Sequence, residues 1–239
     1  MLITRPEPDA ASFAALCEGH GLTAIAAPIM TIISEARPID LKGASALAFT
    51  SANGVRAFSD NSTARQMPVF AVGAATGEAA RLAGFTDIHI AGGDVENLTA
   101  LIEKDRGALA GDVLHIAGAQ RAGDLVGALS RRGVSARRET LYEARAADAL
   151  PQNALIAIRQ TPPVDWAAFF SPRTARLFVA LVEKAGLEDR LCHIRAACLS
   201  DAVAEAAKPA FWKSVAIADQ RDGEGVISAI MGSGINRHA

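Results

Sequence analysis

One motif occurs twice in this chain, first as Phe49-Thr50-Ser51-Ala52-Asn53-Gly54-Val55-Arg56-Ala57-Phe58 and again as Phe169-Phe170-Ser171-Pro172-Arg173-Thr174-Ala175-Arg176-Leu177-Phe178. In each copy an apolar run ends at a serine, and the apolar spacing of an amphipathic helix begins at once. Ser51 and Ser171 therefore stand where a helix N-cap is expected, with a side-chain oxygen accepting a bond from an unpaired backbone N–H. A strand that runs straight into a capped helix is the unit of a parallel α/β sheet, and its repetition indicates internal duplication.

Strands and helices are expected to alternate on both sides of the motif. In the first half, strands are predicted at 46–50, 69–72, 88–91, 113–116 and 134–143, and helices at 52–58, 76–82, 95–102 and 125–129. In the second half, strands are predicted at 166–170, 196–199 and 215–218, and helices at 173–181, 202–207 and 226–231. Alternation with short connections is typical of doubly wound parallel sheets.

The second half has too few strands for a sheet of ordinary size, and the N-terminus can supply the missing unit. Residues 2–4, 11–17 and 23–26 are predicted as strand, helix and strand, in the layout of residues 115–134. We therefore expect two doubly wound parallel-sheet α/β domains, one inserted in the other. The expected bounds are 1–34 with 147–239 for the first domain, 37–140 for the inserted domain, and 29–36 and 140–146 for a two-stranded connector.

The composition is that of a globular protein. The chain has 239 residues, of which 50% are hydrophobic and 21% are charged, and its net charge is −2. The lack of a basic block argues against nucleic acid as a partner, and no apolar run reaches the roughly 18–20 residues of a membrane span. The sequence opens directly as a strand, without the features of a signal peptide. We expect a cytoplasmic monomer with neither nucleic acid nor membrane as partner.

Metal and cofactor chemistry have no support in the sequence. The three cysteines, Cys17, Cys192 and Cys198, show no CxxC spacing, and the five histidines form no HxxxH pair. We expect the cysteines to be small buried apolar residues rather than disulfides or zinc ligands. The Gly118–Gly123 segment has the wrong spacing for a dinucleotide-binding loop. No cofactor is expected.

Small polar residues and arginines follow several predicted strands. They are Arg5, Ser51, Thr76, Arg121, Ser171 and Ser200. Ligands of doubly wound sheets bind beyond the carboxyl ends of the strands, and helix N-termini there attract anions without a large net positive charge. Two lobes with these ends facing each other would form a cleft suited to a small polyanion. The serines could equally be caps with no ligand role, and Arg56 and Arg176 could be solvated surface residues.

At this point the sequence resembles a known family. Leu2-Ile3-Thr4-Arg5-Pro6, Phe49 to Val55, Ala71-Val72-Gly73 with Thr76, Leu141-Tyr142 and Phe170-Ser171-Pro172 together look like uroporphyrinogen-III synthase. The motifs cover nearly the whole chain in the expected order, and each one alone is short. The resemblance implies two α/β lobes joined by a two-stranded connector.

The resemblance also implies a cofactor-free reaction. Hydroxymethylbilane, a linear tetrapyrrole with eight carboxylates, loses its hydroxyl as water, its last pyrrole is inverted through a spiro intermediate, and the ring closes as uroporphyrinogen III. Tyr142 matches the family's cleft tyrosine and would assist departure of the hydroxyl as a hydrogen-bond donor or general acid. An unperturbed phenol has a pKa of about 10, so it is a donor at neutral pH. Tyr142 could instead be an aromatic residue that packs the connector.

Two alternatives stay open. The chain could be a non-enzymatic two-lobed protein that binds a small polyanion at the same sites. It could also be a two-domain sugar-nucleotide transferase, but such an enzyme would need a longer chain and a clearer nucleotide site. One residue departs from the family pattern, because Val203 occupies the place equivalent to Thr76, where many members carry threonine. Ser200, three residues earlier, could supply a replacement hydroxyl at that helix N-terminus, and the sequence leaves open whether it does.

Overall fold

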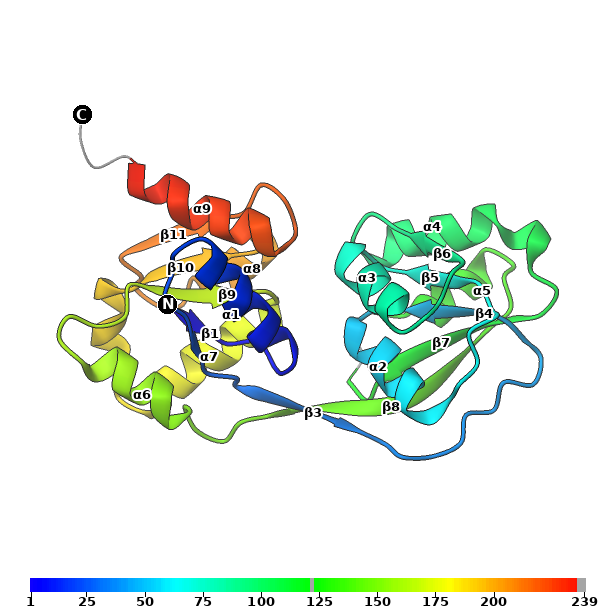
Figure 1. The fold of residues 1–239 in the computed structure, drawn as a ribbon, viewed down its shortest axis with the longest axis horizontal. Coiled ribbons are helices and arrows are strands. Elements are labelled where there is room, and N and C mark those ends of the chain that lie inside the picture. The colour runs from blue at the N-terminus through cyan, green and yellow to red at the C-terminus, as the bar shows by residue number, and fades with distance from the viewer. Residues whose placement is uncertain (121–122, 236–239) are drawn as a thin grey trace. The chain divides into compact units, whose positions relative to one another are not determined.

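A computed structural model describes residues 1–120 and 123–235 of the chain, which divides into two units (Figure 1). The first unit comprises Met1–Thr31 together with the chain from Arg145 onward, and the second comprises Ile32–Ala144. The chain therefore passes from one unit to the other twice, after Thr31 and after Ala144.

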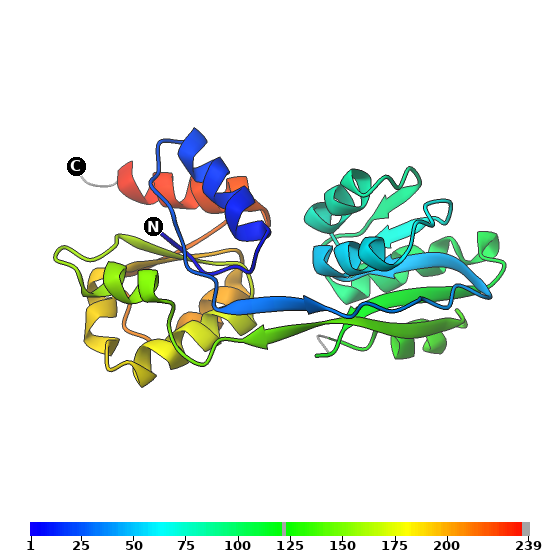
Figure 2. The ribbon, with the colours of Figure 1, turned by 60° about the horizontal axis from the view of Figure 1, so that its bottom comes forward.

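The first unit is built on a five-stranded sheet with the strand order β11-β10-β9-β1-β2, all of whose pairings are parallel. Its strands are β1 (Leu2–Ile3), β2 (Ile25–Ala26), β9 (Trp166–Phe169), β10 (Arg195–Cys198) and β11 (Ser214–Ile217). One face is covered by α1 (Asp9–Gly19) and α9 (Gly223–Ile235), which lie side by side in Figures 1 and 2. The other face packs on α6 (Gln152–Arg159), α7 (Pro172–Lys184), η2 (Glu188–His193) and α8 (Asp201–Ala207).

The second unit is built on a six-stranded sheet with the order β3-β8-β7-β4-β5-β6. Its strands are β3 (Met30–Ser34), β4 (Ala44–Phe49), β5 (Val69–Ala71), β6 (Ile88–Ile90), β7 (Asp112–Gly118) and β8 (Ala136–Ala146). One face is covered by α2 (Ala52–Asn61) and α3 (Ala74–Leu82), and the other by α4 (Val95–Lys104) and α5 (Leu125–Arg131), with η1 (Arg106–Ala108) after α4. β3 is the edge strand beside β8, where the Glu35 N–H donates to the Leu141 carbonyl at 2.8 Å.

The two sheets repeat one topology. Strands β6-β5-β4-β7-β8 of the second unit correspond to β11-β10-β9-β1-β2 of the first, so β1, α1 and β2 stand where β7, α5 and β8 stand. Ser51 and Ser171 are both N-caps directly after the corresponding strands β4 and β9. This arrangement confirms the predicted fold class of two parallel α/β sheets.

Three details differ from the sequence-based expectations. Helix α6 was not predicted, because its eight residues lie between proline-rich stretches that signal a boundary. Helix α3 begins two residues before Thr76, with Gly73 as its N-cap. Cys17 and Cys198 are buried as expected, but Cys192 is exposed, since it lies in η2, where the neighbouring Leu191 is the residue that points into the core.

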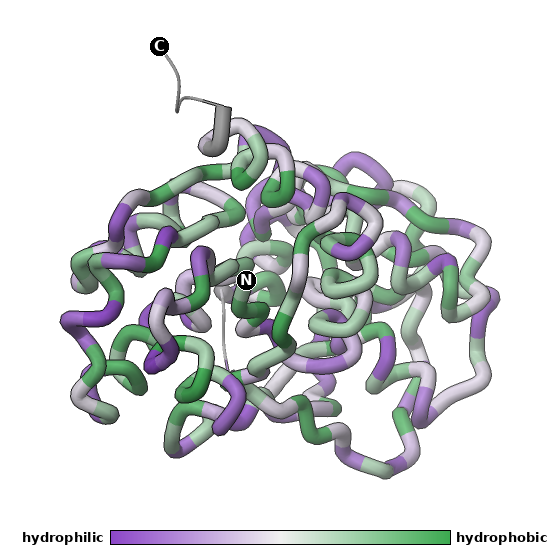
Figure 3. Tube along the Cα trace, turned by 60° about the vertical axis from the view of Figure 1, so that its left-hand side comes forward, coloured by the Kyte–Doolittle hydropathy of each residue, from purple (hydrophilic) through white to green (hydrophobic). Residues whose placement is uncertain are grey.

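Polar residues interrupt the apolar ones along the trace (Figure 3). Within residues 1–120 and 123–235, no helix has the length and apolar character needed to cross a membrane.

Candidate active site

The predicted site residues of the second unit follow adjacent strands. Thr76 comes after β5, Ser51 after β4, and Tyr142 lies on β8, while Gly118 ends β7 between them. Because the sheet is parallel here, the carboxyl ends of these strands lie at one edge, where ligands of doubly wound folds bind.

Ser51 has two roles at the start of α2. Its side-chain oxygen accepts a hydrogen bond from the Asn53 N–H at 3.2 Å, which is the capping interaction that the sequence predicts. Its side chain also lies near the Tyr142 phenol, where it favours the phenolate form. Ser51 can therefore cap α2 and influence the Tyr142 phenol at the same time, so capping alone does not account for its role.

Tyr142 is buried, with 9% of its surface exposed. Burial raises the pKa of its phenol above 10, and this rise is opposed by the Ser51 side chain, the Arg138 guanidinium and the Gly118 backbone, which all favour the phenolate. The phenol is therefore protonated at neutral pH and able to donate. Tyr142 is also part of the core, because it belongs to the same buried cluster as Leu114, Ile116 and Leu141.

A β-bulge sets the direction of Tyr142. Between β7 and β8 the register passes from Ala117 opposite Thr140 to Gly118 opposite Tyr142, so that Leu141 is the extra residue. Bulges of this kind re-aim side chains and are common beside active sites. Without the bulge, Leu141 would lie opposite Gly118 and the phenol would not.

A second polar group lies on the opposite face of β7. His115 is 6% exposed, its Nε2 lies 3.1 Å from Thr50 Oγ1, and its Nδ1 is buried without a hydrogen-bond partner. Burial, helped by the nearby Arg138 guanidinium, lowers the pKa of His115 from 6.5 to about 4. His115 is therefore neutral at pH 7, and it interacts with Thr50, the residue that precedes Ser51.

Thr76 is 5% exposed and lies three residues after the N-cap Gly73. Val203 occupies the same place in α8, three residues after the N-cap Ser200, and is 1% exposed. Ser200 makes no side-chain capping bond, although it holds the N-cap position. Its hydroxyl is thus not committed to the cap.

The first unit brings Arg5, Ser171 and Ser200 to the ends of the adjacent strands β1, β9 and β10. Arg5 forms an ion pair with Asp9 at 3.2 Å, and its guanidinium lies 4.3 Å from the ring centroid of Phe170. Ser171 Oγ accepts from the Thr174 N–H at 3.1 Å and lies 2.7 Å from Thr174 Oγ1. Each unit therefore carries its own set of polar groups at the carboxyl edge of its sheet.

Arg121, the remaining predicted site residue, lies outside the residues that the structure describes. Sequence reasoning did not single out Gly118, His115 or Arg138 as parts of a site. A glycine at a strand end can signal close approach of another group, so Gly118 alone carried a usable signal.

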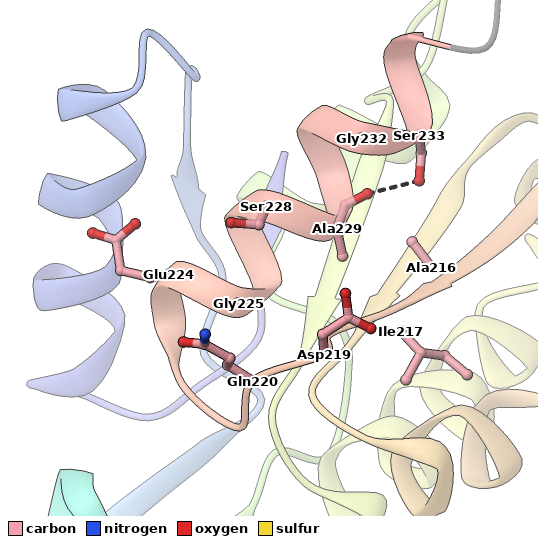
Figure 4. Close-up of a pocket in the computed structure, with 10 residues that line it drawn as sticks. All are labelled: Ala216, Ile217, Asp219, Gln220, Glu224, Gly225, Ser228, Ala229, Gly232 and Ser233. Atoms are coloured by element: carbon pink, nitrogen blue, oxygen red, sulfur yellow. Dashed lines mark hydrogen bonds between the residues drawn. The ribbon is translucent and has the colours of Figure 1, made fainter.

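A surface pocket of about 470 Å³ lies between β11 and α9 of the first unit (Figure 4). Its lining includes Asp219, Glu224, Ser228 and Ser233, whose hydroxyl donates to the Ala229 carbonyl at 2.7 Å. None of the ten labelled residues is a lysine or an arginine, and none is a predicted site residue. With two carboxylates and no cation, this pocket does not suit a polyanion.

Within the part of the chain that the structure describes, no group of three His, Cys, Asp or Glu residues is placed to hold a metal ion. Among the described residues, the polar groups at the two sheet edges include hydroxyls, the Tyr142 phenol, the Arg5 and Arg138 guanidinium groups and helix N-termini. Fold and site together define a two-sheet α/β protein with anion-attracting strand ends and a buried hydrogen-bond donor.

Comparison with known proteins places this chain within that class. The family model "Uroporphyrinogen-III synthase HemD" matches residues 11–228, and the chain therefore belongs to the uroporphyrinogen-III synthase family. No curated protein sequence gives a significant match. Family membership supports an enzyme that cyclises hydroxymethylbilane in tetrapyrrole synthesis, and nothing supports the alternative of a non-enzymatic binding protein.

Two solved structures are similar to this chain in fold. Uroporphyrinogen-III synthetase from Helicobacter pylori is 16% identical with a TM-score of 0.63, and the match covers 89% of this chain and 93% of that one. A mutant uroporphyrinogen III synthase from the extremely thermophilic bacterium Thermus thermophilus is 18% identical with a TM-score of 0.57, over 98% and 97% of the two chains. At these identities the likeness concerns the fold.

Proposed function

We propose that this enzyme converts hydroxymethylbilane into uroporphyrinogen III and water, with Tyr142 as the group that assists loss of the hydroxyl. Membership of the family supports the reaction. The observation that carries the role of Tyr142 is the placement of the chain's single tyrosine at the carboxyl edge of a sheet, buried beside Ser51 and a backbone N–H.

The phenol is suited to this step because it stays protonated. As the carbon–oxygen bond of the hydroxymethyl group breaks, the electron pair leaves with the oxygen, and a donated proton makes that oxygen a water molecule. The Ser51 side chain and the Gly118 backbone stabilise the negative charge that grows on the phenol oxygen. The substituted α-carbon of the last pyrrole attacks the cationic carbon left behind, which gives the spiro intermediate. The older bond from that α-carbon to its bridging carbon then breaks, and the unsubstituted α-carbon of the same pyrrole bonds to the freed bridging carbon. The hydrogen that this last carbon loses returns the proton to the phenolate, and the ring becomes aromatic again.

Binding of the carboxylates is assigned to Arg5, Ser51, Thr76, Arg121, Ser171 and Ser200. Four of these residues stand at helix N-termini, where backbone N–H groups and the helix dipole favour anions: Ser51, Thr76, Ser171 and Ser200. A substrate with eight carboxylates requires many such contacts. Holding its conformation is central to the proposal, because the free substrate cyclises spontaneously to the wrong isomer.

The organisation of the chain is proposed on the same basis. Residues 1–34 with 147–239 form one domain and 37–140 the inserted one, with connector strands at 29–36 and 140–146. The two passages between units and the edge position of β3 beside β8 support this division. We further assign the enzyme to the cytoplasm as a monomer that needs no cofactor.

The test is to supply the purified protein with hydroxymethylbilane and resolve the product isomers by chromatography. The proposal expects the type III isomer, formed faster than the spontaneous reaction. Formation of the type I isomer alone, at the spontaneous rate, would overturn it and leave only the binding of a polyanion.

A further inference from the structure

We propose that Gly118 is a positioning residue for Tyr142: because it has no Cβ, the tyrosine ring can lie across strand β7 and bring its phenol oxygen to the Ser51 side chain. The inference rests on the proposed function, since it explains how the group assigned to hydroxyl departure is aimed. Gly118 itself is not proposed to touch the substrate.

The order of the strands shows why the ring has to cross β7. Strand β7 lies between β8, which carries Tyr142, and β4, which leads into Ser51. Phe49 is opposite Ile116 in the β4–β7 ladder, so counting two residues on places Ser51 level with Gly118. Gly118 is in turn opposite Tyr142 in the β7–β8 ladder. The three residues thus form a row across three strands.

Tyr142 can reach Ser51 only by passing over Gly118. Neighbouring strands are about 4.8 Å apart, so the backbones of the outer two residues are about 10 Å apart. A tyrosine is long enough to bridge this span only if it lies flat on the middle strand. Burial of the ring, its closeness to the Cβ position of Gly118 and the influence of the Ser51 side chain on the phenol agree with such a path.

The middle position has no room for a side chain. A Cβ on Gly118 would lie 2.8 Å from Tyr142 Cε2, 2.9 Å from Cζ and 3.3 Å from the phenol oxygen, and real Cβ atoms essentially never come within 3.0 Å of another group. The backbone of Gly118 does not lie in the left-handed region. The requirement for glycine therefore comes from the ring and not from the conformation of the chain.

The peptide of Gly118 is also held in place from β8. The Ala119 N–H donates to the Tyr142 carbonyl at 2.7 Å, which fixes the two strands beside the bulge. The Arg138 guanidinium donates to the Gly118 carbonyl and, at 3.0 Å, to Thr140 Oγ1. These hydrogen bonds hold the Gly118 peptide against β8, which is the kind of support that a precisely aimed catalytic group requires.

The test combines Gly118→Ala with Tyr142→Phe and follows kcat and KM for uroporphyrinogen III formation. In the wild-type background, Gly118→Ala is expected to lower kcat by about tenfold to a hundredfold with a change in KM below about threefold. In the Tyr142→Phe background, the same change should alter kcat by less than about twofold, since no phenol is left to misplace. An equal loss of kcat in both backgrounds, or no loss in either, would overturn the proposal.

A second readout uses the single tyrosine of the chain, whose ionisation is observed without interference from another phenol. Absorbance titration of Gly118→Ala should give a phenol pKa closer to 10 than in the wild type, because the methyl group forces the ring out of its buried place. An unchanged pKa would contradict the inference. Gly107→Ala is the matched control, since a Cβ on Gly107 meets nothing within 4 Å in the same unit.

The proposal can be decided even if Gly118→Ala does not fold. The double variant Gly118→Ala/Tyr142→Ala removes the ring that the new methyl group would strike, so it is expected to fold. If both variants fail to fold, glycine is needed for another reason and the inference is wrong. If the wild type makes only the type I isomer, the proposed function fails, while the titration still decides where the ring lies.

Discussion

His115 Nε2 lies 3.1 Å from Thr50 Oγ1, on the face of β7 that points away from Tyr142. This histidine is nearly completely buried beside the Arg138 guanidinium, and both features disfavour its charged form. Its Nδ1 has no hydrogen-bond partner. A neutral imidazole therefore lies on the other face of β7 from Tyr142.

Acid is predicted to destabilise the protein through His115. The folded pKa of about 4 lies below the unfolded value of 6.5, so the unfolded state binds the proton more tightly and the free energy of unfolding falls as the pH drops from 6.5 toward 4. The expected loss from this residue is about 3 kcal/mol. Urea unfolding of the wild type and of His115→Gln over this pH range measures it.

The His115→Gln variant should lose most of the decrease in the free energy of unfolding between pH 6.5 and pH 4. His193→Gln is the control, because His193 is exposed, and its unfolding should follow the wild type. An identical pH dependence in the wild type and in His115→Gln would contradict the assignment.

The phenol of Tyr142 is predicted to titrate above pH 10. Burial is the main cause, and the sole tyrosine makes the absorbance of tyrosinate a direct measure of this group. Since the folded pKa exceeds the unfolded one, the free energy of unfolding should fall as the pH rises beyond about 10. A midpoint at or below 10 in the folded protein would show that the phenol is solvated.

Ser51→Ala is predicted to raise the pKa of Tyr142 further and to lower stability by about 1 kcal/mol. The serine hydroxyl favours the phenolate, and its oxygen caps α2. Asp94→Ala is the matched control in the same unit: it removes the cap of α4, where Asp94 Oδ1 accepts from the Asn97 N–H at 2.8 Å, without touching the phenol. Equal phenol pKa values in the two variants would remove Ser51 from the site.

Thr76→Val is predicted to raise KM by about fivefold to tenfold with little change in kcat, because a hydroxyl that binds a substrate carboxylate acts equally in the ground and transition states. Thr99→Val provides the control. Thr99 is equally buried, but its hydroxyl donates to the Val95 carbonyl at 2.6 Å within α4. Should both variants keep the wild-type KM, Thr76 would be a packing residue only.

Much of the fold could be predicted because its signals are local. The serine N-caps at Ser51 and Ser171, the glycine stops and the apolar strand runs all depend on residues that are neighbours in sequence. The one long-range inference was that the N-terminal segment completes the sheet of the first unit, because the second half has too few strands and residues 2–26 share the layout of residues 115–134. Helix α6 was not predicted, because the prolines on either side of it resemble those of a linker. In the structure, Pro151 takes the N-cap position of this helix.

The candidate site was harder to predict, because it depends on register. No local sequence pattern predicts the bulge at Leu141. Without that bulge, Tyr142 would not lie opposite Gly118. The contact between His115 and Thr50 joins residues 65 positions apart, and it exists only because β4 and β7 are neighbours. Sequence reasoning could therefore name the tyrosine and the serine caps, but not the row of residues that aims them.

The most direct test of the account is the turnover of Tyr142→Phe with hydroxymethylbilane. Loss of the phenol hydroxyl is predicted to lower kcat for uroporphyrinogen III by about a hundredfold or more, with a small change in KM, since general acid assistance contributes about 10²–10⁴-fold. The type I isomer should then accumulate as the spontaneous reaction competes. Unchanged turnover to the type III isomer would contradict the central role of Tyr142 and leave it a packing residue.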